Sequence, residues 1–160
     1  MEDHSVTHVE KPAIIPEGWE NQVSRHRILV VDDDDNIRRL NSEALARSGY
    51  HVKSAIDGAE GWKALNTDRF DLLITDNNMP NLTGIELIKK LNAAGMAVPV
   101  ILASGVWHRE ESELQLAAIL PKPFTLAELL GTVKKVLGQG DNGECQAPAS
   151  NPPPVDPWRA

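Results

Sequence analysis

The segment ILVVDDDD (residues 28–35) decides how the chain folds, because a short β-branched apolar run gives way directly to four carboxylates. A continuous apolar run of this length suits a strand that is buried on both faces, as in a parallel sheet. Similar runs recur at residues 72–74 and 98–102, with weaker candidates at residues 51–55 and 118–120. The sequence therefore predicts five short strands.

Residues at helical spacing fill the gaps between these strands. The clearest apolar stripe lies near the C-terminal end and consists of Leu126, Leu129, Leu130, Val133 and Leu137. Asp35 is placed to cap the first helix and Thr125 the last. Strands that are each followed by a helix predict right-handed crossovers and a doubly wound α/β parallel sheet.

Composition and charge exclude several classes of function. The 160 residues carry 23 Asp and Glu against 16 Lys and Arg, a formal net charge of −7. This acid excess disfavours nucleic acid as a partner, since non-specific binding needs clustered cations. The single cysteine, Cys145, excludes an internal disulfide and any cysteine-based metal site. No apolar run approaches the roughly 20 residues of a membrane helix and no secretory signal is evident, so we expect a cytoplasmic protein without a membrane partner.

The two ends of the chain differ from its centre. Residues 1–25 show no hydrophobic period, and residues 139–160 combine turn-forming residues with Pro152-Pro153-Pro154. We therefore expect flexible N- and C-terminal tails on one domain that covers residues 26–138. Trp158 lies in the second tail, where a scattered exposed aromatic and a docking anchor are both open interpretations.

Polar side chains follow four of the predicted strands: Asp32 with Asp33, Asp76, Ser104 and Lys122. Ligands of an open α/β sheet bind beyond the carboxyl ends of its strands, so we expect these side chains to share one edge. Gathered carboxylates raise each other's pKa unless a cation joins them, and hard oxygen ligands suit Mg²⁺. A lysine and a hydroxyl at the same edge can bind phosphoryl oxygens, and an Asp carboxylate can take up phosphate covalently.

Four segments resemble the receiver domain of two-component response regulators. They are residues 28–33 (ILVVDD), 73–84 (LITDNNMPNLTG), 99–105 (PVILASG) and 122–124 (KPF). Each motif alone is weak, but all of them in order are very specific, and the resemblance covers about residues 26 to 138. It implies a (βα)5 flavodoxin-like sheet with strand order 2-1-3-4-5.

The resemblance also implies a role for each matching position. Asp76 is the expected phosphoacceptor, Ser104 the switch hydroxyl that moves toward the phosphoryl group, and Lys122 the lysine that pairs with that group. A cis peptide bond is implied between Lys122 and Pro123, where cis costs only about 0.5–1 kcal/mol.

The same resemblance implies Mg²⁺ as the cofactor and assigns its ligands. Asp33 matches the direct ligand of the acidic pair, and Asp32 matches the partner that usually holds metal-bound water. Asp76 and the backbone carbonyl of Asn78 complete the expected set.

Two departures from the family pattern lie on the side that usually transmits the signal. Ile119 occupies the switch position where the family commonly has Tyr or Phe. The stretch from Ser104 to Lys122 is a few residues shorter than is typical, so a fourth helix over about residues 109–116 should be short or irregular. We expect the phosphorylation chemistry to be intact, and the sequence leaves the ordinary output mechanism open.

The leading hypothesis is a stand-alone, chemotaxis-type receiver that acts as a signalling phosphoacceptor and not as an enzyme with a separate substrate. It would take a phosphoryl group from a sensor histidine kinase or a histidine phosphotransfer protein. About 20 residues follow Leu137, too few for a DNA-binding output domain, so the output would be binding to a downstream protein that the sequence does not identify. The sequence is also compatible with a weak homodimer.

Two alternatives carry other functions. A receiver-shaped interaction scaffold with atypical or no phospho-switching is favoured by Ile119 and the short fourth helix. A phosphatase of the haloacid dehalogenase type fits poorly, because Asn36 stands where that motif has Thr or Val.

Overall fold

The computed structural model describes residues 26–106 and 112–138 of the chain. The predicted tails, residues 1–25 and 139–160, lie outside the described residues. The elements of the described part are β1 (Arg27–Val31), α1 (Asp35–Arg47), β2 (His51–Ala55), α2 (Gly58–Thr67), β3 (Leu72–Asp76), α3 (Gly84–Ala93), β4 (Val100–Ser104), β5 (Ala118–Pro121) and α4 (Leu126–Gly138).

The strands form one parallel sheet in the order β2-β1-β3-β4-β5. In this register Val30 of β1 lies opposite Ser54 on one side and Ile74 on the other. The strand order reverses at β1, so the carboxyl ends of β1 and β3 flank the switch point of the sheet. The predicted doubly wound α/β fold and its strand order are confirmed.

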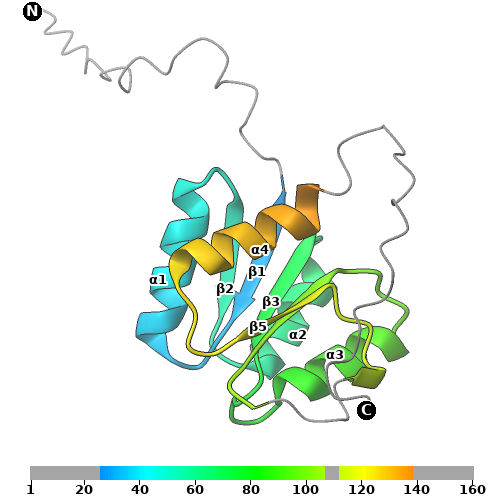
Figure 1. Cartoon of the computed structure of the whole chain (residues 1–160). Helices are drawn as coiled ribbons and strands as arrows, with labels where there is room; N and C mark the ends of the chain where they lie inside the picture. Colours follow the sequence, from blue (N-terminus) through cyan, green and yellow to red (C-terminus); the bar gives the residue numbers. More distant parts are fainter. Residues whose placement is uncertain (1–25, 107–111, 139–160) are drawn as a thin grey trace, which may run out of the picture.

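Helices cover both faces of the sheet (Figure 1). α2 and α3 pack on one face against Leu29 and Leu73, and α1 and α4 pack on the other face against Ile28. Successive strand residues point to opposite faces, so a strand that is covered on both sides must be apolar throughout. This explains why the apolar runs are continuous and do not alternate.

The first and last helices test the predicted caps. Asp34, not Asp35, caps α1: its side chain accepts hydrogen bonds from the amides of Asn36 (2.9 Å) and Ile37 (3.1 Å). The prediction was wrong by one residue, because Asp34 keeps the extended backbone that a cap needs and Asp35 is already helical. The predicted cap of α4 is confirmed, since Thr125 accepts a hydrogen bond from the amide N–H of Glu128 at 3.2 Å.

The short or irregular fourth helix predicted over about residues 109–116 lies only partly within the described residues. Residues 107–111 lie outside the described part, and residues 112–117 contain only a short 3₁₀ turn and no α-helix. Leu114 and Leu116 nevertheless pack against the core that α2 and α3 cover. Two leucines on an irregular segment thus bury apolar surface where the sequence analysis expected a short or irregular fourth helix.

None of the helices among the described residues is long and apolar enough to cross a bilayer.

The packing of α4 predicts a large effect of removing one side chain. Leu129 is 0% exposed, and Leu129→Ala is expected to lower the free energy of unfolding by about 2–5 kcal/mol through lost burial and a residual cavity. Leu40 on α1 is 53% exposed, so the control Leu40→Ala should stay within about 0.5 kcal/mol of the parent. Urea unfolding followed by circular dichroism measures both, and equal losses would contradict this packing.

Candidate functional site

Three carboxylates meet at the carboxyl edge of the sheet. Asp32 directly follows β1, and Asp76 is the last residue of the neighbouring strand β3. Oxygens of Asp32, Asp33 and Asp76 lie within 4.8 Å of one another. Asp32 is 5% exposed and Asp76 is 7% exposed, whereas Asp33 is open to solvent. The structure therefore brings together the three acidic residues that the sequence singled out, and we call them the acidic cluster.

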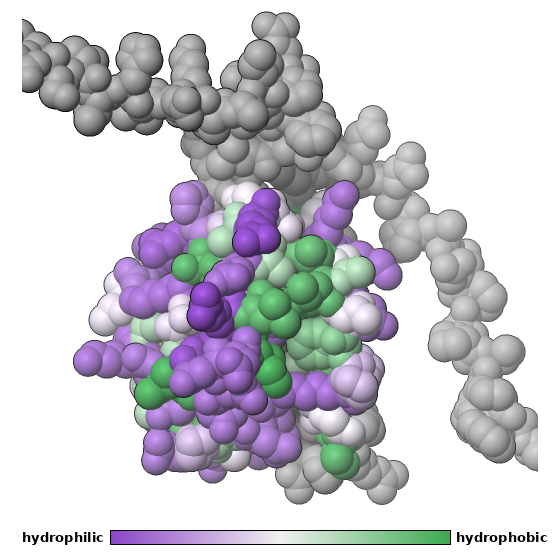
Figure 2. Space-filling model, turned by 90° about the vertical axis from the view of Figure 1, so that its left-hand side faces the viewer, coloured by the Kyte–Doolittle hydropathy of each residue, from purple (hydrophilic) through white to green (hydrophobic). Residues whose placement is uncertain are grey.

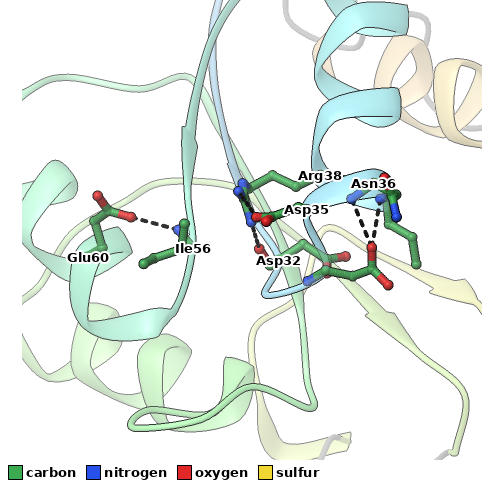
Figure 3. A network of polar contacts seen from close by, with 8 residues as sticks. Asp32, Asp35, Asn36, Arg38, Ile56 and Glu60 are labelled. Atoms are coloured by element: carbon green, nitrogen blue, oxygen red, sulfur yellow. Dashed lines mark hydrogen bonds and ion pairs between the residues drawn. The ribbon is translucent and has the colours of Figure 1, made fainter.

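Backbone contacts and one arginine fix Asp32 in place (Figure 3). Its Oδ1 accepts a hydrogen bond from the amide of Asp34 at 2.9 Å. Its backbone carbonyl accepts one from Arg38 Nη1 at 2.9 Å, and Arg38 also pairs with Asp35. Arg38 was not among the predicted site residues, although an arginine three residues after Asp35 on a helix indicates an ion pair between the two.

The acidic cluster has an electrostatic cost. Burial is the largest cause that raises the pKa of Asp32, and the carboxylates of Asp76 and Asp33 raise it further. The amide of Asp34 and the ammonium of Lys122 act in the opposite direction, without cancelling the rise. A further cation among these oxygens would relieve the repulsion.

The carboxylate of Asp76 is paired with the ammonium group of Lys122. Its Oδ1 lies 2.9 Å from Nζ of Lys122 and accepts a hydrogen bond from the amide of Asn77 at 2.8 Å. Both contacts use the same oxygen, so neither occupies Oδ2. The side chain of Lys122 is 27% exposed, which leaves its ammonium group reachable from solvent.

Two neighbouring strands hold Lys122 at this position. Its backbone amide donates to the carbonyl of Ser104 at 2.9 Å, which continues the β4–β5 ladder by one residue. The peptide bond from Lys122 to Pro123 is cis, as the family resemblance implied.

Ser104 ends β4 at the same edge, but its hydroxyl is engaged within its own loop. Ser104 Oγ donates to the carbonyl of Val106 at 2.7 Å and accepts from the Val106 amide at 3.4 Å. The strand places this serine as predicted. The hydroxyl itself bonds to the loop and not to the acidic cluster.

The last two predicted residues lie outside the acidic cluster. Asn78 is exposed in the loop from β3 to α3, two residues beyond Asp76. Ile119 is half-buried in β5, where with Phe124 and Thr132 it lines a cavity of about 440 Å³ beside α4. Ile119 is therefore part of the β5–α4 surface.

Gly84 lets helix α3 begin directly against the end of β3. A Cβ at this position would lie 2.3 Å from the backbone carbonyl oxygen of Asp76, which no side chain can accept. The Gly84 amide donates to the carbonyl of Asn77 at 3.1 Å. Any larger residue here would push apart the segments that carry Asp76.

The residues present fit a magnesium ion. Mg²⁺ is held in proteins by one or two carboxylates with waters and further oxygens, and it has little affinity for sulfur. The acidic cluster offers three carboxylates, and the loop that follows Asp76 contains the exposed Asn78 with its backbone carbonyl. The pKa of Asp32 is raised mainly by burial and further by the carboxylates of Asp76 and Asp33, and a bound cation would oppose this rise.

Comparisons with known proteins agree with this geometry. The model of the response regulator receiver domain matches residues 28–134. The transcriptional regulatory protein PrrA of Mycobacterium tuberculosis is 37% identical over 119 residues, which are 72% of this chain and 51% of PrrA. The chain thus spans about half the length of the curated relatives it matches.

Two solved structures are similar over nearly their whole length. The receiver domain of the Francisella response regulator 1452 is 30% identical with a TM-score of 0.66, over 72% of this chain and 99% of that one. The response regulator TrrA of Thermotoga maritima, solved in complex with Mg²⁺-BeF, is 33% identical with a TM-score of 0.62, over 69% and 98%.

The raised pKa of Asp32 predicts a pH-dependent gain from Asp32→Asn. Asp32 is harder to ionise in the folded chain than in the unfolded chain, so its charge destabilises the fold above the folded pKa, and the penalty fades as pH falls through it. Without divalent ions, Asp32→Asn should therefore be more stable than the parent at pH 7 and lose that advantage toward pH 4.

Added Mg²⁺ should reduce this advantage of Asp32→Asn at pH 7. Ligand at ten times its dissociation constant stabilises a protein by about 1.4 kcal/mol, and the variant should gain less than the parent. Thermal unfolding with EDTA and with MgCl₂ measures both effects. A variant that is less stable than the parent in EDTA would refute this electrostatic account.

Proposed function

The chain belongs to the response regulator receiver family of two-component signalling, and on that premise we propose that it accepts a phosphoryl group on Asp76. The donor is the phosphohistidine of a sensor histidine kinase or a histidine phosphotransfer protein. The observation that carries the proposal is the 2.9 Å contact between Lys122 Nζ and Asp76 Oδ1 beside two further carboxylates. Asp76 is buried, its Oδ1 pairs with Lys122, and its Oδ2 makes neither this contact nor the one to the Asn77 amide. Such an oxygen is suited to nucleophilic attack.

The transfer exchanges one bond to phosphorus for another. A carboxylate oxygen of Asp76 attacks phosphorus, and the bond from phosphorus to the imidazole nitrogen breaks. The imidazole keeps the electron pair and takes a proton from solvent, and Asp76 becomes an acyl phosphate. Water later attacks this phosphorus, the bond from phosphorus to the Asp76 oxygen breaks, and inorganic phosphate leaves with the carboxylate restored. In this proposal the chain catalyses only its own phosphorylation and dephosphorylation.

The residues around Asp76 have separate tasks in this proposal. Lys122 pairs with the phosphoryl oxygens, since its ammonium already lies beside the acceptor. Asp32, Asp33, Asp76 and the backbone carbonyl of Asn78 hold Mg²⁺. When bound, Mg²⁺ supplies positive charge that offsets the phosphoryl oxygens.

Ser104 is the proposed switch. Its hydroxyl gives up the bond to the carbonyl of Val106 and turns toward the phosphoryl oxygens, whose negative charge makes them better acceptors than a neutral carbonyl. The loop after β4 loses one anchor as a result. A phosphoryl group that bonds Ser104 in only one of two loop arrangements shifts the population toward that arrangement.

An apolar surface beside the acceptor suits a phosphodonor protein. On α1, Ile37 is 37% exposed and Leu40 is 53% exposed. Both line a cavity of about 430 Å³ together with Lys122, Phe124 and other residues of the β5–α4 connection. Figure 2 faces the side on which α1 lies and shows hydrophobic side chains gathered within a hydrophilic surface. A donor docked here would present its phosphohistidine next to Lys122 and Asp76.

A scaffold without phospho-switching is the second candidate. It is favoured by the local Ser104–Val106 bonds and by the irregular residues 112–117 in place of a helix. Such a scaffold would keep the receiver shape and the output by protein contact. It would not respond to phosphorylation of Asp76.

Asp76→Asn is expected to abolish phosphorylation, because the amide is a far weaker nucleophile than the carboxylate. The chain is incubated with phosphoramidate and MgCl₂, and the gain of one phosphoryl group is measured by intact-protein mass spectrometry. Asp68→Asn, which removes a half-buried carboxylate paired with Lys53 at the end of α2, is the control and should label like the parent. Equal labelling of Asp76→Asn would overturn the acceptor assignment, and an unlabelled parent would favour the scaffold.

Leu40→Asp should separate docking from chemistry. A charge on the apolar face of α1 is expected to slow transfer from a phosphorylated histidine phosphotransfer protein by about tenfold or more, a loss of roughly 1.4 kcal/mol of contact energy. Labelling by phosphoramidate should stay unchanged, because this small donor needs no protein surface. Equal slowing with both donors would assign Leu40 to the site itself.

A further inference from the structure

A single side-chain hydrogen bond joins two loops near the acidic cluster. Asn81, in the loop from β3 to α3, donates from Nδ2 to Oδ2 of Asp57 at 3.0 Å. Asp57 lies between β2 and α2, and its other oxygen, Oδ1, accepts from the amide of Glu60 at 2.8 Å as the cap of α2. One carboxylate therefore caps a helix and anchors a distant loop at the same time.

The backbone on both sides of this bond is shaped to permit it. Asn81 has a φ of 66°, a left-handed conformation that asparagine tolerates better than most residues. Gly58 follows Asp57 at a point where a Cβ would lie 2.4 Å from the carbonyl oxygen of Leu82. The two loops thus touch through their main chains as well as through Asn81.

The capping loop is itself anchored. The amide of Ile56 donates to Oε2 of Glu60 at 2.7 Å, which ties the residue before Asp57 back to the first turn of α2 (Figure 3). Asp57 and Glu60 together close this turn from both directions. The Asp57 carboxylate, which accepts the hydrogen bond from Asn81, is therefore held in place by the first turn of α2.

The exposed Asn78 lies on a short span between fixed points. On one side the amide of Asn77 donates to the carbonyl of Ala103 at 3.2 Å. On the other side Met79 is 7% exposed and belongs to the core, and Asn81 is tied to Asp57. The orientation of the Asn78 carbonyl depends on where these anchors hold the loop.

We propose that Asp57 and Asn81 are positioning residues for the Mg²⁺ site, which hold the β3–α3 loop so that the Asn78 carbonyl is aimed at the ion. Neither side chain touches the ion or the phosphoryl group. This inference rests on the proposed function, because it takes the Asn78 carbonyl as a ligand. Outer partners that orient a ligand commonly change metal affinity by 10–100-fold when they are removed.

Two variants remove the bond from opposite ends. Asn81→Gly keeps the left-handed backbone available and changes no charge. Asp57→Ser keeps an oxygen for the cap of α2 but removes the acceptor for Asn81. The double variant completes a double-mutant cycle. If the bond between the two side chains is the cause, the second substitution should add little to the loss of Mg²⁺ affinity caused by the first. Asp68→Asn is the control for the lost negative charge, since it lies at the other end of α2.

Mg²⁺ alone is titrated into the ¹⁵N-labelled full chain, and amide shifts are followed by NMR. The amide of Met79 reports on the Asn78 carbonyl, since both belong to one peptide group. We expect each single variant to bind Mg²⁺ about tenfold more weakly, with a smaller limiting shift at Met79, and the double variant to match them. Asp68→Asn should bind like the parent, and thermal unfolding confirms that each variant is folded.

The outcomes separate this inference from the proposed function. If the parent binds Mg²⁺ and Asn81→Gly binds it equally tightly with the same Met79 shift, the positioning role is wrong and the site stands. If losses in the two single variants add up fully in the double variant, the bond between them is not the cause, which also overturns the inference. If the parent itself binds no Mg²⁺ and takes no phosphoryl group from phosphoramidate, the proposed function fails first.

Discussion

Like-charge repulsion at the carboxyl edge of the sheet determines which groups must surround its acidic residues. Three carboxylates lie within 4.8 Å of one another, and two of them are almost fully buried. Such a cluster is stable only if cations and amides surround it, and Lys122, Arg38 and the amides of Asp34 and Asn77 lie around it here. Under the proposed function, the uncompensated negative charge of the cluster attracts a divalent cation, and that cation together with Lys122 then offsets the charge of phosphoryl oxygens. The fold therefore carries an electrostatic penalty at the proposed Mg²⁺ site.

The sequence predicted most of this edge because parallel sheets leave little freedom. Once the apolar runs are assigned as strands, Asp32, Asp76, Ser104 and Lys122 must fall at the same end. The sequence could not predict contacts that depend on side-chain rotation. The Ser104 hydroxyl bonds to its own loop, and one side-chain rotation separates this position from one that faces the acidic cluster. Asp34 caps α1 in place of the predicted Asp35, because two adjacent aspartates offer the same capping group one residue apart.

The connection from β4 to β5 shows a second limit of sequence reasoning. A shortened segment predicted a short or irregular helix, but the pattern did not reveal that Leu114 and Leu116 would pack on the core from described residues that form no α-helix. Burial of apolar side chains does not require regular backbone if polar groups find partners, and the amide of Ala117 finds the carbonyl of Val100. The Asp57–Asn81 bond was missed for a different reason, since it joins two loops that lie 24 residues apart in the sequence and no periodic pattern links them.

The first turns of α1 have two sides with different neighbours. Arg38 reaches inward to the Asp32 carbonyl, while Ile37 and Leu40 face outward. If the proposed phosphodonor docks on this face, substitutions on the outward side alter which donor is recognised, and the contact between Arg38 and the Asp32 carbonyl is preserved. On the same condition, a duplicated copy of the gene would diverge in its donor through changes at a few surface positions and would keep the inward contact intact.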